Sequence, residues 1–268
     1  MTQPITGPGK TTIDLGLDSH IHTRLCNHAA GEMEEYVRAA LNTGLHTIIF
    51  KEHLEEDIVY FERTWLTEAD FAYYFEEGGR LQEKYRDRIT IKLGVEIGFN
   101  PQAIDSLHEK ITRYPWDHIG LSYHYYFTGK EHLNMVSRRQ SNIKKLAALG
   151  AEKILSEYFS GLIQGITHLD CHILCHLDAV MRHYPDLQFT SSHMAQIERI
   201  LKLVKQKNMS LEINTSGYAI RNEPYPEKTI LKKAIAMNIP LMAGSDAHHP
   251  KQVGRYFDLL PDLLASLG

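Results

Sequence analysis

Seven short apolar runs alternate with longer amphipathic segments along this chain of 268 residues, and this alternation constrains the fold more than any other feature. The runs are rich in β-branched residues, which favour strands, whereas apolar residues recur at helical spacing in the segments between them. Repeated strand–helix units predict an α/β fold with a parallel sheet. The expected strands are Ile13–Ser19, Thr47–Lys51, Ile89–Val95, His118–Ser122, Ile173–Cys175, Ser210–Asn214 and Pro240–Gly244.

Seven such strands predict a closed or nearly closed barrel, with an open doubly wound sheet as the competing architecture. The dinucleotide-binding form of the open sheet loses support because no G-x-G-x-x-G pattern follows the first strand. No low-complexity linker divides the chain after residue 12. We therefore expect one domain over residues 1–268, with an irregular tail at residues 1–12.

The amphipathic segments carry start and stop signals of helices. A capping-box pattern opens at Thr67, and we expect Gly78-Gly79 to interrupt the helix that follows. A second division is expected near Ser160-Gly161. The expected helices are Glu32–Leu41, 67–86, Asn142–Phe159, Gly161–Leu169, Ala195–Lys207, Glu227–Met237 and Asp258–Leu264. The longest stretches without an expected element, Leu54–Leu66 and Tyr125–Ser141, are typical of lids or binding loops.

Side chains that can bind metal follow six of the seven expected strands. In a parallel barrel the carboxyl ends of the strands meet at one face, where active sites lie. Burying so many ionisable groups without a cation would be costly, and nine ligands exceed the need of one tetrahedral ion. The sequence therefore predicts a multinuclear divalent-metal centre. The candidate ligands are His20, His22, His28, His53, Glu96, His124, His176, Asp246 and His248.

Composition limits the partners and the compartment. The net charge of −4 disfavours a broad nucleic-acid-binding surface but is compatible with a local basic pocket for one phosphate. No apolar stretch approaches the roughly 18 residues of a membrane span, and residues 1–12 lack the apolar core of a secretory signal. Three cysteines are too few for a disulfide framework. We therefore expect a cytoplasmic protein without nucleic-acid or membrane partners, whose oligomeric state stays open.

The order of the candidate ligands resembles that of the PHP (polymerase and histidinol phosphatase) metallophosphoesterases. The resemblance spans the chain from Ile13 onward and includes Asp-x-His-x-His at 18–22, Gly-Val-Glu96, Cys-His176-Leu-Asp and Gly-Ser-Asp246-Ala-His248. Within this superfamily, segments 211–217, 223–226 and 244–250 are most similar to the monofunctional histidinol-phosphate phosphatases. Two motifs depart from the usual pattern: Glu52 replaces the Asp before His53, and Tyr123 replaces a small residue before His124.

The resemblance implies a distorted seven-stranded barrel, similar to a TIM barrel, with a trinuclear site that zinc, iron or manganese could occupy. It implies a first ion on His20, His22, Glu96 and Asp246, a second shared by Glu96 with His124 and His176, and a third on His28, His53 and His248. The implied reaction is hydrolysis of the phosphate monoester L-histidinol phosphate, in histidine biosynthesis, by a metal-bridging hydroxide.

Arginines are the candidate groups for holding the phosphate, because a guanidinium can donate two parallel hydrogen bonds to it. Arg138, Arg139 and Arg221 lie in segments expected to reach the barrel mouth, although each is equally compatible with a solvated surface position. Asp246 or a metal-bound water is the candidate acid for the leaving alkoxide. Asp18 is expected to share a face with His20 and to hydrogen-bond an imidazole.

Three other functions stay open. The first is a PHP phosphatase acting on another small ester, such as a nucleotide or a sugar phosphate. The second is a metal-binding regulatory domain without catalysis, which is disfavoured because no candidate ligand is missing. The third is an amide hydrolase on a similar barrel, which would be expected to offer a carboxylated lysine or a histidine-rich binuclear site. Among the strand-end positions only Lys51 fits such a lysine.

Overall fold

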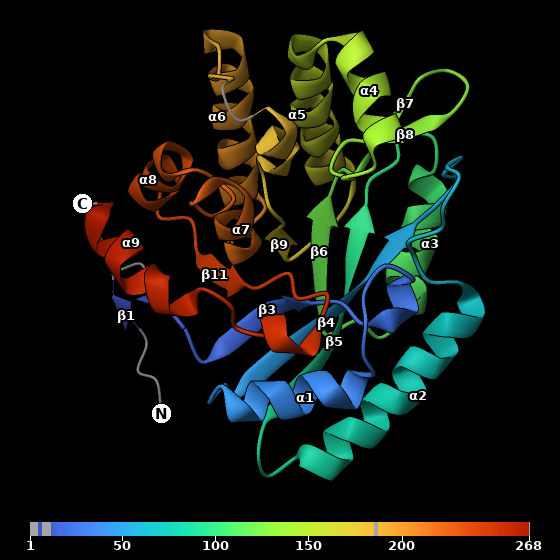
Figure 1. Cartoon of the computed structure of the whole chain (residues 1–268), viewed down its shortest axis with the longest axis vertical. Helices are drawn as coiled ribbons and strands as arrows, with labels where there is room; N and C mark the ends of the chain where they lie inside the picture. Colours follow the sequence, from blue (N-terminus) through green and yellow to red (C-terminus); the bar gives the residue numbers. More distant parts are fainter. Residues whose placement is uncertain (1–4, 7–11, 185–186, 268) are drawn as a thin grey trace.

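Seven parallel strands curl into a nearly closed barrel surrounded by helices (Figure 1). The computed structural model describes residues 5–6, 12–184 and 187–267. The strands pair in the order β3–β4–β5–β6–β9–β10–β11. Their bounds are β3 Leu17–Ile21, β4 Thr47–Glu55, β5 Thr90–Gly98, β6 His118–Ser122, β9 Ile173–Leu174, β10 Ser210–Asn214 and β11 Leu241–Gly244. The predicted α/β barrel is confirmed over the open sheet.

The barrel closes between its two edge strands through a short bridge. Ile21 at the end of β3 pairs with Ala247, which follows β11. The backbone N–H of His22 donates to the carbonyl of Ala247 at 2.9 Å. This closure brings the carboxyl ends of the first and last strands together, so that residues more than 200 positions apart in the sequence become neighbours.

Helices cover the outside of the barrel (Figure 1), with α1 to α3 on one side and α4 to α6 on the opposite side. Capping boxes begin several of them, as at Thr67, whose hydroxyl accepts the N–H of Asp70 before α2. Among the described residues the helices are α1 Met33–Asn42, α2 Glu68–Tyr85, α3 Ile104–Arg113, α4 Gln140–Leu149, α5 Ala151–His168, α6 Ser191–Gln206, α7 Tyr218–Arg221, α8 Lys228–Ala236 and α9 Leu260–Ser266.

Two expected helix interruptions are wrong, because the glycines concerned serve close packing. Gly78 lies inside the continuous helix α2, where a Cβ atom would come within 2.5 Å of Leu93. Gly161 lies inside α5, where a Cβ atom would come within 2.3 Å of the Tyr123 ring. The actual division between α4 and α5 falls at Gly150, whose φ of +88° is strained for other residues.

Several elements differ from the sequence expectation. Helix α3 was not expected, and the stretch expected to be irregular after β6 contains the hairpin of β7 (Tyr125–Phe127) and β8 (His132–Asn134). The tail is not wholly irregular either, because β1 (Ile5–Thr6) pairs antiparallel with β2 (Thr12–Ile13). Residues 1–4 and 7–11 of that tail lie outside the described residues.

Alternation along the barrel strands separates an apolar outer face from a polar interior. In β4, Ile48, Phe50 and Leu54 join the apolar core beneath the helices. His53 and Glu55, at alternate positions, instead contact the polar side chains of the barrel mouth. The strands therefore bury an apolar layer against the helices and present polar groups to the barrel axis.

A bulge in β3 overturns the expected placement of Asp18. The pairs Asp18–Ile48 and Ile21–Phe50 are three residues apart in β3 but two apart in β4. One extra residue therefore flips the alternation, and Asp18 does not share a face with His20. The Asp18 carboxylate accepts the backbone N–H groups of Ser245 and Gly254, both at 2.9 Å, and so anchors the loop after β11.

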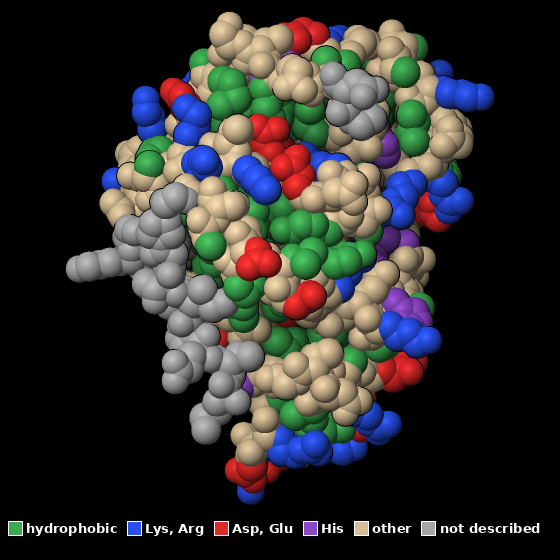
Figure 2. Space-filling model, turned by 60° about the vertical axis from the view of Figure 1, so that its left-hand side comes forward, with side chains coloured by type: hydrophobic (Ala, Val, Ile, Leu, Met, Phe, Trp, Pro, Cys, Tyr) green, Lys and Arg blue, Asp and Glu red, His purple; other side chains and the backbone are tan. Residues whose placement is uncertain are grey.

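The surface is mixed in charge on the face drawn in Figure 2. Acidic and basic side chains are interspersed among hydrophobic ones, and histidines reach the surface along the right-hand edge of the view. Among the helices that the structure describes, none combines the length and the apolar character needed to cross a membrane.

Candidate metal centre and substrate cavity

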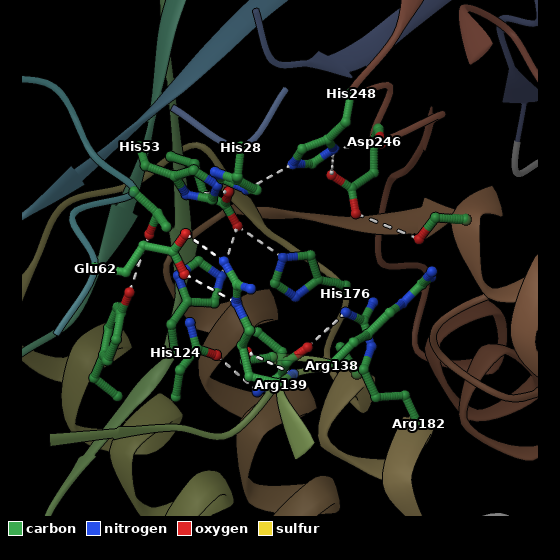
Figure 3. Close-up of a pocket in the computed structure, with 18 of the residues that line it drawn as sticks. His28, His53, Glu62, His124, Arg138, Arg139, His176, Arg182, Asp246 and His248 are labelled. Atoms are coloured by element: carbon green, nitrogen blue, oxygen red, sulfur yellow. Dashed lines mark hydrogen bonds and ion pairs between the residues drawn. The ribbon is translucent and has the colours of Figure 1, made fainter. Parts of the chain in front are cut away.

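The nine predicted metal ligands converge at the carboxyl ends of the barrel strands. His20, His53 and Glu96 lie within β3, β4 and β5, and the others lie in the segments that follow β3, β6, β9 and β11. Figure 3 shows six of them facing one cavity: His28, His53, His124, His176, Asp246 and His248. The fold thus places side chains from both halves of the sequence around one point.

Glu96 lies at the centre of this group and faces histidines with both of its carboxylate oxygens. Its Oε2 atom lies 3.3 Å from His20 Nε2 and 3.4 Å from His22 Nε2. Its Oε1 atom lies 2.7 Å from His176 Nε2 and 3.3 Å from His124 Nε2. The two oxygens therefore address two separate pairs of imidazoles, as a carboxylate that bridges two cations would.

The remaining ligands form a second group beside the first. Asp246 Oδ1 lies 3.4 Å from His22 Nε2 and 3.5 Å from His248 Nδ1. His248 Nε2 lies 2.9 Å from His28 Nε2. His28, His53 and His248 each offer a ring nitrogen within 4.8 Å of the others. His53 also reaches Glu96 Oε2 at 3.0 Å and so lies between the two groups.

Two buried glutamates that the sequence analysis did not select hold ligand imidazoles in place. Glu212 Oε1 lies 2.6 Å from His20 Nδ1, and Glu55 Oε1 lies 2.7 Å from His124 Nδ1. An outer carboxylate of this kind fixes the orientation of a metal-binding imidazole and increases its basicity. The available signal was the two-residue spacing from the inward-facing His53 and Asn214, which places both glutamates on the inner face.

Burial and neighbouring charges act differently on different ligands: carboxylates overcome burial and raise the pKa of His20 well above its usual value, with Glu212 foremost, and that of His124 to about 10, with Glu96 foremost. Burial, together with His248 and His53, lowers the pKa of His28 to about 3, and the pKa of His22 is lowered well below its usual value for the same kinds of reason. Burial alone would raise the pKa of Glu96, but the surrounding imidazoles, His124 foremost, lower it well below its usual range. Ligands of a divalent cation must be neutral imidazoles and ionised carboxylates.

His20 shows how the donor atoms fit a cation. Its Nδ1 faces Glu212 at 2.6 Å, so in the neutral ring that metal binding requires, Nε2 presents its lone pair to His22 Nε2, which lies only 2.9 Å away. Two lone pairs buried this close repel each other unless a proton or a cation lies between them. Imidazole nitrogens and carboxylate oxygens together suit zinc, iron and manganese, so the residues present fit a divalent metal centre.

A cavity of about 470 Å³ opens over the metal-ligand group. Four arginines line it, and the hydroxyphenyl rings of Tyr60 and Tyr125, 5.2 Å apart between centroids, form part of the wall. The arginines are Arg138, Arg139, Arg182 and Arg255. A cationic wall facing a cation-binding floor is suited to a small anionic ligand.

The predicted arginines are only partly brought to this cavity. Arg138 and Arg139 line it (Figure 3), whereas Arg221 is not among its lining residues. The Arg221 guanidinium donates to buried Asp178 at 2.9 Å and stacks 4.3 Å from the centre of the Tyr225 ring. Its side chain is only 13% exposed, so we correct the expectation that Arg221 grips phosphate and assign it to an internal ion pair.

Arg182 and Arg255 were missed from the sequence because their segments gave no strand-end signal. Arg182 lies in the short 3₁₀ helix Ala179–His183 and donates to the carbonyl of Val136 at 2.8 Å. Arg255 donates to the carbonyls of Ser245 and Asp246 at 2.8 and 3.0 Å. Both guanidiniums are thus held by backbone carbonyls, which leaves their positive charge uncompensated by these contacts.

Comparison with known proteins places this site in a family. The model of the PHP domain matches residues 18–216, and that of a PHP-associated segment matches residues 229–263. The chain belongs to the PHP domain family. Seven of the nine converging side chains, and both of the glutamates behind them, lie within residues 18–216. The other two, Asp246 and His248, lie within residues 229–263.

Several relatives of this PHP protein carry a common description. A Deinococcus radiodurans protein described as a probable histidinol-phosphatase is 30% identical over 92% of this chain and 92% of its own length. The histidinol-phosphatase of Bacillus subtilis is 24% identical over 90% of this chain and 96% of its own length. The crystal structure of histidinol phosphate phosphatase from Lactococcus lactis, complexed with zinc, L-histidinol and phosphate, superposes with a TM-score of 0.76 at 22% identity, covering 94% of this chain and 93% of that chain.

Proposed function

We propose that this PHP protein is a metal-dependent phosphomonoesterase that hydrolyses L-histidinol phosphate to L-histidinol and phosphate. One observation carries the proposal: nine side chains suited to divalent metal lie at the floor of a cavity whose wall carries four arginines. The relatives described as histidinol-phosphatases and the zinc, histidinol and phosphate bound by the Lactococcus lactis enzyme support this substrate. The proposal includes a single barrel domain and a place in histidine biosynthesis in the cytoplasm.

The metal centre is proposed to hold three divalent ions. The first ion would be held by His20, His22, Glu96 and Asp246. The second would be held by His124 and His176, together with Glu96. The group of His28, His53 and His248 is assigned to the third. Zinc, iron and manganese are the candidate metals.

Divalent ions bound here would supply Lewis acidity toward the phosphoryl oxygens and would lower the pKa of the attacking water. The chain's own contribution is to orient and to neutralise the substrate. Arg138 and Arg182 are assigned to the phosphoryl oxygens, since charge develops there during transfer and a fixed guanidinium stabilises it. Arg139 directly precedes α4 with its side chain at the rim, where it can reach an incoming phosphate.

The role of Asp246 as an acid is the least supported part of the sequence prediction. Burial alone would raise the pKa of Asp246, but the contact with His22 and the charges of His20 and His248 lower it well below its usual range. An ionised carboxylate accepts hydrogen bonds, as the Asp246 carboxylate does from Ser216 Oγ at 3.3 Å. It is a poor proton donor at neutral pH. We therefore assign Asp246 to metal binding. We assign to water the role of donating a proton to the leaving alkoxide.

The test is a substrate panel with quantified metal. The purified protein would be given L-histidinol phosphate, a sugar phosphate, a nucleoside monophosphate and an amide, and kcat/KM would be measured for each. We expect a preference of about 100-fold or more for L-histidinol phosphate, because a site that pairs each polar group of its substrate rejects analogues lacking them. Equal or greater turnover of another monoester would overturn the proposed substrate.

A further inference from the structure

One carboxylate of the cavity has no place in the metal centre. Of the acidic residues described as lining the cavity, Glu96 and Asp246 contact the ligand histidines, whereas Glu62 lies in the loop between β4 and α2. Its carboxylate accepts two hydrogen bonds from Arg139, at 2.6 Å from Nη2 and 3.1 Å from Nε (Figure 3). A negative group on an otherwise cationic wall requires an explanation other than phosphate binding.

The partner of Glu62 can be exchanged easily. The side chains of Glu62 and Arg139 are 33% and 59% exposed, so both are solvated when they separate. Ion pairs in such positions contribute little to stability, because water compensates both charges. The ion pair between Arg139 and Glu62 is therefore weak, and a cation that enters the cavity can replace the guanidinium.

The proposed substrate brings such a cation. L-histidinol phosphate carries an ammonium group on the carbon next to its ester methylene, so the ammonium must enter the cavity together with the phosphate. Arg138, Arg182 and Arg255 would repel it, and the metal ligands are engaged at the floor. Beside Glu62 in the same loop, the hydroxyl of Tyr60 is buried and makes no hydrogen bond within the described part of the chain, which marks this wall as prepared for a polar ligand.

We propose that Glu62 is a specificity-determining residue that binds the ammonium group of the amino-alcohol substrate, displacing the Arg139 guanidinium. This inference rests on the proposed function and adds to it the group that distinguishes an amino-alcohol phosphate from other monoesters. A carboxylate that pairs with an ammonium inside a cavity favours substrates that carry that charge, because only they replace the Arg139 contact with a new ion pair to the bound substrate.

The test compares two substrates that differ only in the ammonium group: L-histidinol phosphate and 3-(imidazol-4-yl)propyl phosphate. The ratio of their kcat/KM values measures recognition of the ammonium. In Glu62→Gln we expect this ratio to fall by about 10- to 100-fold, mainly through a higher KM for L-histidinol phosphate. Glu62→Asp should retain part of the ratio. The control is Glu83→Gln, which removes an exposed Glu–Arg pair in the last turn of α2, at a residue that does not line the cavity.

Each outcome has a distinct meaning. An unchanged ratio in Glu62→Gln, with both kcat/KM values lowered equally, would overturn the role of Glu62 while leaving the proposed function intact. A wild-type protein that hydrolyses both compounds equally would also overturn it, because no group then recognises the ammonium. A wild-type protein that hydrolyses other monoesters but neither of these two would instead overturn the proposed function itself.

Discussion

Two groups of histidines lie in this barrel, one at the carboxyl ends of the strands and one near the amino ends. At the carboxyl ends, Glu96 contacts five imidazoles, and Glu212 and Glu55 hold two of them from behind. Near the amino ends, His118 and His172 stack with ring centroids 5.3 Å apart. Within the described residues, neither of this second pair forms an ion pair with a carboxylate.

The buried His118 shows that burial alone does not make a histidine a metal ligand. Burial and the positive charge of Lys51 lower the pKa of His118 to about 2, and burial with Lys51 and Lys92 lowers that of His172. Both imidazoles are neutral, as ligands must be, but their surroundings are cationic and would repel a metal ion. Carboxylates on the adjacent strands, rather than the number of histidines, distinguish the metal centre.

The largest effect is expected from removing the carboxylate at the centre of the first group. Glu96→Ala should lower kcat on the proposed substrate by about a thousandfold or more, because it removes the group that faces both pairs of histidines. His118→Asn is the control from the second group and should keep kcat near the wild-type value. Wild-type activity in Glu96→Ala would break the distinction between the two groups.

Chelation should remove metal from the group of histidines at the carboxyl ends of the strands, because the pair His118 and His172 is not expected to bind any. Removing the metal should abolish activity and lower Tm by several degrees, since ligands that bind only the folded state stabilise it. Activity should return on adding zinc, manganese or iron(II), and the return would rank these metals. A protein with full activity and unchanged Tm after exhaustive chelation would contradict a catalytic metal centre.

A smaller effect is expected from the carboxylate behind the centre. Glu212→Gln leaves His20 without its charged partner and should weaken metal binding by about 10- to 100-fold. Metal titration of the chelated protein would measure this change. Glu198→Gln, which removes an exposed acid paired with Lys233, is the matched control and should bind metal like the wild type. Equal affinities in the two variants would show that Glu212 does not orient His20.

The smallest effect concerns stability at acid pH. The pKa of His118 is about 2 in the folded chain and about 6.5 in the unfolded chain, so the unfolded state binds more protons between these values. His118 therefore contributes stability above pH 6.5 that is lost as the pH falls. Between pH 7 and pH 5, the free energy of unfolding should fall by about 1–2 kcal/mol less in His118→Asn than in the wild type, as measured by chemical unfolding. Parallel pH profiles of the two proteins would contradict this.

The sequence predicted the barrel and the nine converging side chains because both depend on strand periodicity and on what ends each strand. The strands His118–Ser122 and Ser210–Asn214 have the expected bounds. Asp18 was misplaced because a bulge changes the alternation without leaving a sequence signal. The helix break was misplaced because Gly161 serves contact with Tyr123, a residue that only the fold brings near.

The parts of the site that could not be predicted depend on contacts between distant segments. Glu55 and Glu212 acquire their roles only when β4 and β10 meet His124 and His20 across the barrel. Arg221 was a candidate for binding phosphate because its segment was expected to reach the barrel mouth, but Asp178, from the segment after β9, pairs with it. Charged residues near a mouth are therefore less predictable than metal ligands, whose number and order restrict the possibilities.

The most direct test of the account is the metal content per chain of the wild type, Glu96→Ala and His118→Asn, measured by elemental analysis after purification and reloading. We expect the same content, near three divalent ions, in the wild type and His118→Asn, and a clear loss in Glu96→Ala. Equal metal content in all three proteins, with equal activity, would contradict the claim that the carboxylate-centred group of histidines is the metal centre.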